Sequence, residues 1–180
     1  MPDLYAGDSV PVDMPANFNV MKWAKTGRGG KGHMPDQVDP IASKIISYLR
    51  TELHVEKIGS VGYCYGAKYV ARFSAKGKGI DAACMCHPSF VDAGEIEAMT
   101  VPVSIAAAEN DEIFPASKRR ETEDILKGKG VPYQMCLYSD VAHGFAVRGD
   151  MSDRKIRFAK EAAFLQCVQW FHEHLGKTGD

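Results

Sequence analysis

IGSVGYCYGA, residues 58–67, carries the strongest structural signal in this chain. A short apolar run ends at Cys64, and a helical pattern begins at Gly66, so a strand and a helix meet at the cysteine. Gly-x-Cys-x-Gly at such a junction is the pattern of a nucleophile elbow, with sulfur in the place of the usual serine oxygen. We expect glycine to be required at both Gly62 and Gly66, because side chains there would collide with the neighbouring helix and strand.

The helix that follows Cys64 would direct its N-terminus at the sulfur. Backbone N–H groups and the helix dipole at that position favour a thiolate and a developing oxyanion. The motif alone is only suggestive, since free cysteine is among the most buried residue types and usually serves packing.

The alternation of strand and helix continues along the chain. Apolar, strand-like runs cover residues 58–64, 80–86, 101–108 and 131–139, and helical patterns cover residues 41–53, 66–75, 94–99, 117–128 and 153–175. Strands of this kind between helices predict an α/β fold with a mostly parallel sheet and helices on both faces. Residues 1–40 are rich in glycine, proline and aspartate, and we expect a long, mobile connection there.

Polar residues follow each predicted strand, where open parallel sheets bind their ligands. They are Cys64, His87, an acidic segment at residues 109–112, and His143. The order nucleophile, acid, histidine is that of the α/β-hydrolase fold. Within the acidic segment, Glu109, Asp111 and Glu112 are all candidates for the acid.

Composition limits the class of ligand. The 180 residues are 45% hydrophobic, which suits a single domain over residues 1–180. Lys and Arg number 22 against 23 Asp and Glu, so no basic field exists for nucleic acid or an anionic membrane, and we expect a small-molecule substrate. No secretory or membrane-spanning pattern is evident, and five cysteines in such a chain favour a reducing compartment, the cytoplasm.

Three segments carry a resemblance to a known family. VGYCYGA at residues 61–67, AENDEIFP at 108–115 and AHGFA at 142–146 resemble the catalytic stretches of dienelactone hydrolases, which are carboxymethylenebutenolidase-like enzymes. PDLYA at residues 2–6 resembles the segment after the strand that precedes the elbow in that family. HPSF at 87–90 and AVRGD at 146–150 are similar to the fungal-type branch.

The resemblance implies roles for individual residues. Cys64 would attack an ester or lactone carbonyl and form an acyl-cysteine, His143 would take and return the proton, and Asp111 would orient the imidazole. The backbone N–H of Tyr65 would be one oxyanion donor. No cofactor is implied, and a thiolate suits activated esters and enol lactones better than amides, as in a carboxylesterase.

Three further residues are candidates for substrate contacts. Arg148 could meet a substrate carboxylate, although a surface arginine is at least as probable. Tyr5 and Phe145 could line the pocket, or simply pack. Cys84 and Cys86 alternate along one strand before His87, but a buried strand explains them and we expect no metal site.

The chain also departs from the family. Dienelactone hydrolases carry further strands and a helix before the PDLYA segment, so we expect an N-terminally truncated fold that lacks one oxyanion donor. The strand that ends at Cys64 would then expose an apolar edge, through which two copies could pair. A non-catalytic protein acting in assembly is therefore the alternative function.

A second departure concerns the substrate. Gly7 stands where bacterial members have an arginine that binds the dienelactone carboxylate, which disfavours dienelactone itself as the substrate.

Overall fold

The computed structural model describes residues 2–11, 13–15 and 17–176. The chain divides into two compact units, Met1–Glu56 and Lys57–Asp180. The single domain expected over residues 1–180 stays a prediction. None of the helices in the described ranges combines the length and the apolarity that a membrane span requires.

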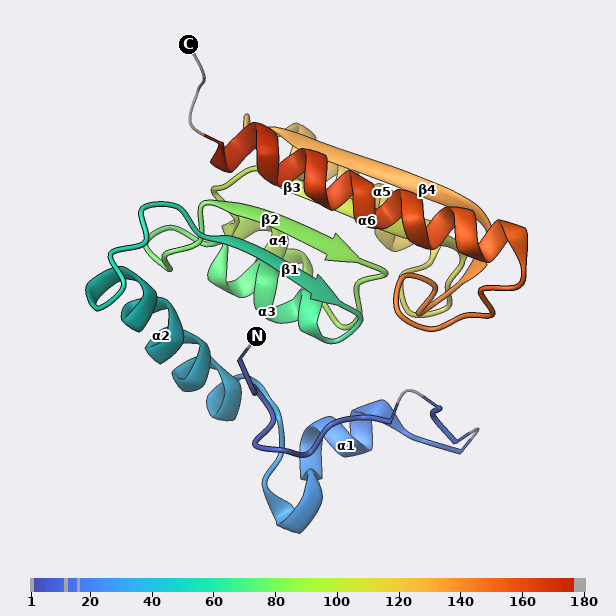
Figure 1. The fold of residues 1–180 in the computed structure, drawn as a ribbon, viewed down its shortest axis with the longest axis horizontal. Helices are drawn as coiled ribbons and strands as arrows, with labels where there is room; N and C mark the ends of the chain where they lie inside the picture. Colours follow the sequence, from blue (N-terminus) through green and yellow to red (C-terminus); the bar gives the residue numbers. More distant parts are fainter. Residues whose placement is uncertain (1, 12, 16, 177–180) are drawn as a thin grey trace. The chain divides into compact units, whose positions relative to one another are not determined.

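The first unit contains more structure than the sequence indicates. It holds α1 (Val20–Thr26), a 3-10 turn η1 (Arg28–Gly30) and α2 (Pro35–Thr51) (Figure 1). The expectation of an irregular connection up to residue 40 is therefore wrong, and the helix predicted from residue 41 begins at Pro35. Proline is well tolerated at a first helical position, because the N–H that it lacks would have no partner in the helix.

A local helix cap and contacts between more distant residues order this unit. The Asn19 side chain caps α1 by accepting a hydrogen bond from the Lys22 backbone N–H at 2.8 Å. The buried His33 ring packs against Trp23, with 4.5 Å between the ring centroids, and its Nε2 lies 2.8 Å from the Asp8 carboxylate.

The second unit is a four-stranded, fully parallel sheet in the order β1-β2-β3-β4. Its strands are β1 (Gly59–Tyr63), β2 (Ala82–Cys86), β3 (Val103–Asn110) and β4 (Tyr133–Ala142), and its helices are α3 (Gly66–Phe73), α4 (Ala93–Ala98), α5 (Ala116–Lys127) and α6 (Arg154–Leu175). The predicted fold class is confirmed, with each element close to its expected position.

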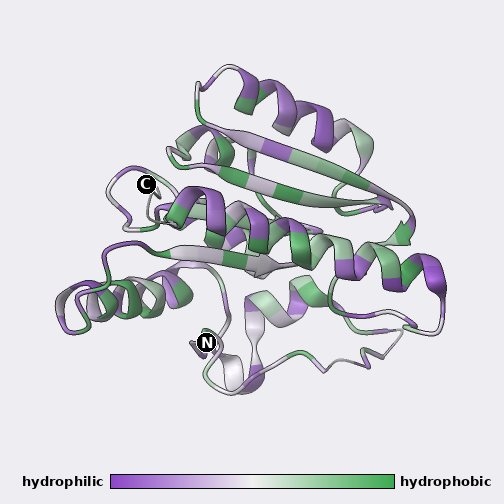
Figure 2. Cartoon of the chain, turned by 45° about the horizontal axis from the view of Figure 1, so that its top comes forward, coloured by the Kyte–Doolittle hydropathy of each residue, from purple (hydrophilic) through white to green (hydrophobic). Residues whose placement is uncertain are grey.

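Alternation along the strands supplies a core on each face of the sheet. Met85 and Ile105 belong to the cluster that packs against α3, α4 and α5, whereas Cys84, Cys86 and Ala106 pack against α6. Figure 1 shows α6 crossing one face of the sheet and α3 lying on the other. The helices carry both hydrophilic and hydrophobic colours in Figure 2, as expected where one side of each helix meets a sheet.

β1 lies at an edge of the sheet, as the sequence predicts. It pairs with β2 alone among the described strands, and its Val61 side chain is 43% exposed. Large apolar side chains of α6, Phe158, Phe164 and Leu165, are also exposed. Pairing of two copies through this edge stays a prediction.

Candidate active site

The sharp turn between β1 and α3 places Cys64 at the end of the sheet. The φ angle of Cys64 is +52°, a left-handed conformation that is rare for residues with a side chain. Its backbone N–H donates to the Cys86 carbonyl at 3.0 Å, and its carbonyl accepts from the Ser89 N–H at 3.0 Å. The elbow is thus held on β2 and on the loop that follows β2.

The two glycines of the motif are not equivalent. A Cβ atom on Gly62 would lie 2.5 Å from the Gly66 carbonyl oxygen and 2.6 Å from its carbon, so Gly62 has no room for a side chain. A Cβ on Gly66 would have no described atom outside its own helix within 4 Å. The expectation that both positions require glycine is correct for Gly62 and wrong for Gly66, which stands at the open first position of α3.

These contacts predict opposite effects for two matched substitutions. Gly62→Ala is expected to lower the free energy of unfolding by about 1–3 kcal/mol, because the added methyl overlaps backbone atoms. Gly66→Ala is expected to be neutral or to stabilise by up to about 1 kcal/mol, since alanine is the better helix former. Urea unfolding of both variants beside the parent protein measures the difference, and equal stability of the two would contradict the geometry.

A continuous chain of close polar contacts runs from the sulfur to a buried carboxylate. The Cys64 Sγ lies 3.2 Å from His143 Nε2, and His143 Nδ1 lies 2.8 Å from Asp111 Oδ2. The other Asp111 oxygen accepts hydrogen bonds from the backbone N–H groups of Ile113 and Phe114, both at 2.9 Å. The parallel sheet therefore brings together the three side chains that the motif order singles out.

The other two acidic candidates lie outside this chain of contacts. Glu109 is exposed, and its carboxylate accepts from the Asp140 backbone N–H at 2.8 Å. Glu112 is also exposed. Of the three carboxylates in this segment, the geometry favours Asp111 as the partner of His143.

Two buried residues of the loop after β2 also face the sulfur. The Ser89 hydroxyl lies 3.2 Å from Cys64 Sγ and 3.1 Å from His143 Nε2. His87 is fully buried, and neither of its ring nitrogens has a hydrogen-bond partner within the described part of the chain. The sequence places His87 at a strand end without a role, and nothing in it singles out Ser89.

The site shifts the pKa values of its sulfur and its imidazole in opposite directions. Burial opposes ionisation of Cys64, but His143, the nearby His87 ring and Ser89 together outweigh it and lower the pKa of the thiol to about 5. Burial likewise opposes the charge on His143, whereas Asp111 and Cys64 raise the pKa of its imidazole to about 9. The pKa of Asp111 is lowered, because hydrogen bonds to His143 and to backbone N–H groups outweigh its burial. Between these values a thiolate and an imidazolium coexist.

Tyr65, the residue expected to supply an oxyanion donor, follows Cys64 directly and stands at the N-cap of α3. Its side chain is buried, and its hydroxyl accepts a hydrogen bond from the Tyr69 hydroxyl at 3.2 Å. The role of the Tyr65 backbone N–H as an oxyanion donor stays a prediction.

The candidate substrate contacts have different surroundings. The Phe145 ring is buried, with its centroid 5.7 Å from that of His87. The Arg148 guanidinium lies against the backbone of Gly144, the residue after His143. The Tyr5 ring belongs to the first unit, where its edge meets the Trp23 ring. Their contacts with a substrate stay predictions.

The remaining core cysteines serve packing between the sheet and α6. The sulfurs of Cys86 and Cys167 lie 3.7 Å apart, and the Cys84 sulfur lies 4.0 Å from the Cys167 carbonyl oxygen. The neighbouring Cys167, together with burial, raises the pKa values of the Cys84 and Cys86 thiols far above the ordinary range. These two thiols therefore stay protonated near neutral pH.

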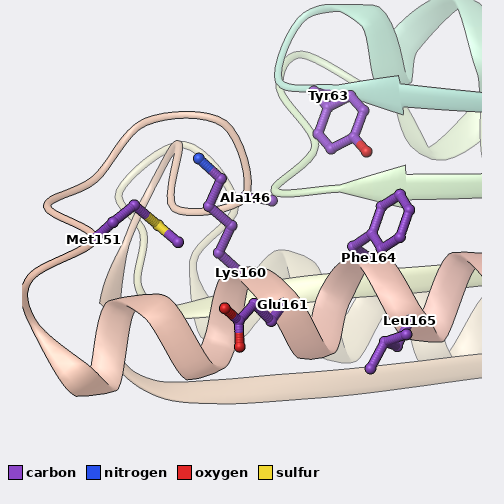
Figure 3. Close-up of a pocket in the computed structure, with 7 residues that line it drawn as sticks. All are labelled: Tyr63, Ala146, Met151, Lys160, Glu161, Phe164 and Leu165. Carbon is purple, nitrogen blue, oxygen red and sulfur yellow. The ribbon is translucent and has the colours of Figure 1, made fainter.

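A hollow of about 440 Å³ lies over α6 beside the end of β1 (Figure 3). The residues that line it are Tyr63, Ala146, Met151, Lys160, Glu161, Phe164 and Leu165. Its walls are mainly apolar, with Lys160 and Glu161 adding charges from α6. Cys64, Asp111 and His143 do not line it, although Tyr63 precedes Cys64 directly.

Comparisons with known proteins concern the family and the fold of the chain. The model of the family described as "Dienelactone hydrolase family" matches residues 1–175. The chain is 46% identical to "Hydrolase tropI" of Talaromyces stipitatus, over 97% of this chain and 69% of that protein, and 45% identical to "Hydrolase pyvD" of Aspergillus violaceofuscus, over 98% and 69%. Both sources are fungi. A crystal structure of a putative dienelactone hydrolase from Klebsiella pneumoniae superposes with a TM-score of 0.69 at 12% identity, covering 96% of this chain and 73% of that one, which shows a shared fold.

Proposed function

The chain belongs to the dienelactone hydrolase family, a family of hydrolases acting on ester and lactone bonds, and from this premise we propose that it cleaves small esters or lactones through a covalent acyl-cysteine on Cys64. The observation that carries the proposal is the chain of contacts from Cys64 through His143 to Asp111. No cofactor is required. Reactive cysteines commonly lie at the N-terminus of a helix, where the thiolate is stabilised.

The pKa values indicate how the first half of the reaction begins. Because the thiol pKa is about 5 and the imidazole pKa about 9, the proton already resides on His143 near neutral pH. The thiolate attacks the carbonyl carbon, and the Tyr65 N–H helps to hold the oxyanion. As the carbon–oxygen bond breaks, His143 Nε2 donates its proton to the departing alkoxide, which leaves as an alcohol. Cys64 is left as a thioester.

The second half returns the enzyme to its starting state. His143, now neutral, accepts a proton from a water molecule that attacks the thioester carbonyl. The carbon–sulfur bond breaks, the acyl group leaves as a carboxylic acid, and the thiolate and imidazolium are restored. Throughout the reaction, Asp111 accepts a hydrogen bond from the Nδ1–H of His143. This contact keeps Nε2 directed at Cys64.

The chemistry of the site limits the class of substrate. A thiolate is a good leaving group, so the tetrahedral intermediate formed from an amide would expel the thiolate rather than the amine, and esters and lactones react better. Arg148, beside the residue that follows His143, would attract a carboxylate on the substrate. All five cysteines are free thiols, which supports function in a reducing compartment such as the cytoplasm.

The pH dependence of kcat/KM on an alkyl ester such as ethyl butyrate tests this proposal, because an alkoxide, unlike p-nitrophenolate, needs a proton in order to leave. Activity is expected to rise through about pH 5 as Cys64 ionises, and to fall through about pH 9 as His143 loses the proton needed by the leaving group. An iodoacetamide control needs only the thiolate, so its reaction with Cys64 should rise through pH 5 and then stay level. A rate of ester cleavage that climbs steadily up to pH 9, as for an ordinary thiol, would contradict the ion pair.

A further inference from the structure

His87 is a buried group at the site to which the hydrolytic mechanism assigns no step. It is fully buried, yet both ring nitrogens are without a hydrogen-bond partner in the described residues. Burying an imidazole in this way is costly unless another group compensates. The aromatic rings of Tyr63 and Phe145 flank it, with centroids 6.1 Å and 5.7 Å away, and neither offers the ring nitrogens a partner.

The ring of His87 lies next to the two groups that would perform the chemistry. Its centroid is 5.1 Å from that of His143, and one donor atom each from Cys64, His87 and His143 lie within 4.8 Å of one another. From these contacts we propose that Cys64, His87 and His143 form a binding site for Zn²⁺, and that the bound ion reversibly inhibits the hydrolase.

The donor set suits this ion. A thiolate and two imidazoles are ligands that Zn²⁺ binds strongly, whereas Mg²⁺ and Ca²⁺ prefer oxygen. Zinc–sulfur and zinc–nitrogen bonds of about 2.3 and 2.0–2.1 Å place tetrahedral ligands roughly 3.3–3.6 Å apart. Cys64 Sγ and His143 Nε2 are already 3.2 Å apart, and the other separations between ligand atoms, all within 4.8 Å, would shorten on binding. Three protein ligands leave the fourth position to water.

The residues around the three ligands also suit a metal site. Asp111 accepts from Nδ1 of His143, so Zn²⁺ would displace the proton from Nε2 and take up that nitrogen's lone pair beside the sulfur, in the carboxylate–histidine arrangement found behind many zinc ligands. The bound ion would occupy both the Cys64 sulfur and the His143 nitrogen, and catalysis would stop until a chelator removes it.

Metal titration tests the proposal without any need for turnover. Competition against a chromophoric chelator should show one tight Zn²⁺ per chain, and Co²⁺ in its place should give a sulfur-to-cobalt charge-transfer band. Zn²⁺ should also protect Cys64 from iodoacetamide. If ester cleavage were absent but the metal bound in this way, the proposed function would fail and the zinc site would stand.

Substitutions at His87 separate this site from simple binding to a cysteine–histidine pair. His87→Asn suits the left-handed backbone at this position, where φ is +37°, and His87→Phe keeps the ring volume. Both are expected to weaken Zn²⁺ binding by at least about 10-fold. His172→Gln, on the exposed side of α6, is the matched control and should bind as the parent does. Unchanged affinity in both folded His87 variants, or tight binding that survives Cys64→Ala, would overturn the proposal.

Discussion

Cys64→Ala is expected to lower kcat/KM for an activated ester by about 10³-fold or more. The alanine keeps the Cβ atom at the elbow but removes the sulfur, so no acyl-enzyme can form and only the binding groups remain. Cys64→Ser should be almost as impaired, because this site is built to ionise a thiol, and the hydroxyl of serine is a far weaker acid. Initial rates on p-nitrophenyl acetate, corrected for spontaneous hydrolysis, measure the loss.

The matched control is Cys136→Ser. Cys136 is a partly exposed thiol on β4, where its sulfur accepts from the Gln134 side chain at 3.2 Å, far from the chain of contacts at Cys64. It should retain the parent activity within about twofold, because surface substitutions away from a site usually have small effects. Thermal unfolding of each variant verifies the fold. Parent-like turnover by folded Cys64→Ala would exclude Cys64 as the nucleophile.

Asp111→Asn is expected to cost about 10³- to 10⁴-fold in kcat, as the corresponding change does in serine hydrolases with this arrangement. The amide can still accept from the backbone N–H groups that hold Asp111, but its NH₂ group would face Nδ1 of His143. The imidazole would then carry its proton on Nε2, pointing at Cys64, and could no longer accept one. The pKa of His143 should fall and that of Cys64 should rise, so alkylation at pH 6 should slow as well.

Glu112→Gln supplies the control for charge in the same segment. Glu112 is exposed one residue after Asp111, so its neutralisation should change kcat by less than about twofold. The comparison decides between the acidic residues that the sequence alone leaves open. A large loss in Glu112→Gln with little effect of Asp111→Asn would contradict the assignment of Asp111.

The sequence predicts the sheet and the order of the candidate triad because both depend on local patterns. Apolar runs closed by glycine or polar residues locate the strands, and parallel strands necessarily bring their carboxyl ends together. Cys64, Asp111 and His143 each follow such a run, so their meeting at one edge can be inferred before any coordinates.

Features that depend on distant contacts were not predictable in this way. The contacts of α1 residue Trp23 and of buried His33 with Asp8 join residues far apart in the sequence, which no periodic pattern records. Ser89 faces Cys64 only because the loop after β2 folds back on the elbow. Likewise, the sequence does not show that Gly62 lacks room for a side chain whereas Gly66 has it, because this difference depends on which backbone atoms lie near each residue.

The protonation state of the site also requires the structure. A sequence motif suggests a histidine that removes a proton from the thiol, whereas the contacts of Asp111 with His143 and of Ser89 with Cys64 outweigh burial and favour a proton already on His143. The imidazole therefore acts first as an acid toward the leaving group. The pH profile proposed above depends on this reversal of roles.

The acyl-cysteine itself gives the most direct test. p-Nitrophenyl trimethylacetate carries a hindered acyl group, whose thioester is slow to hydrolyse and so accumulates. Intact-protein mass spectrometry after an acid quench is predicted to show one trimethylacetyl group per chain, and peptide mapping should place it on Cys64. An acyl group on another residue, or release of p-nitrophenol by Cys64→Ala at the parent rate, would contradict the account.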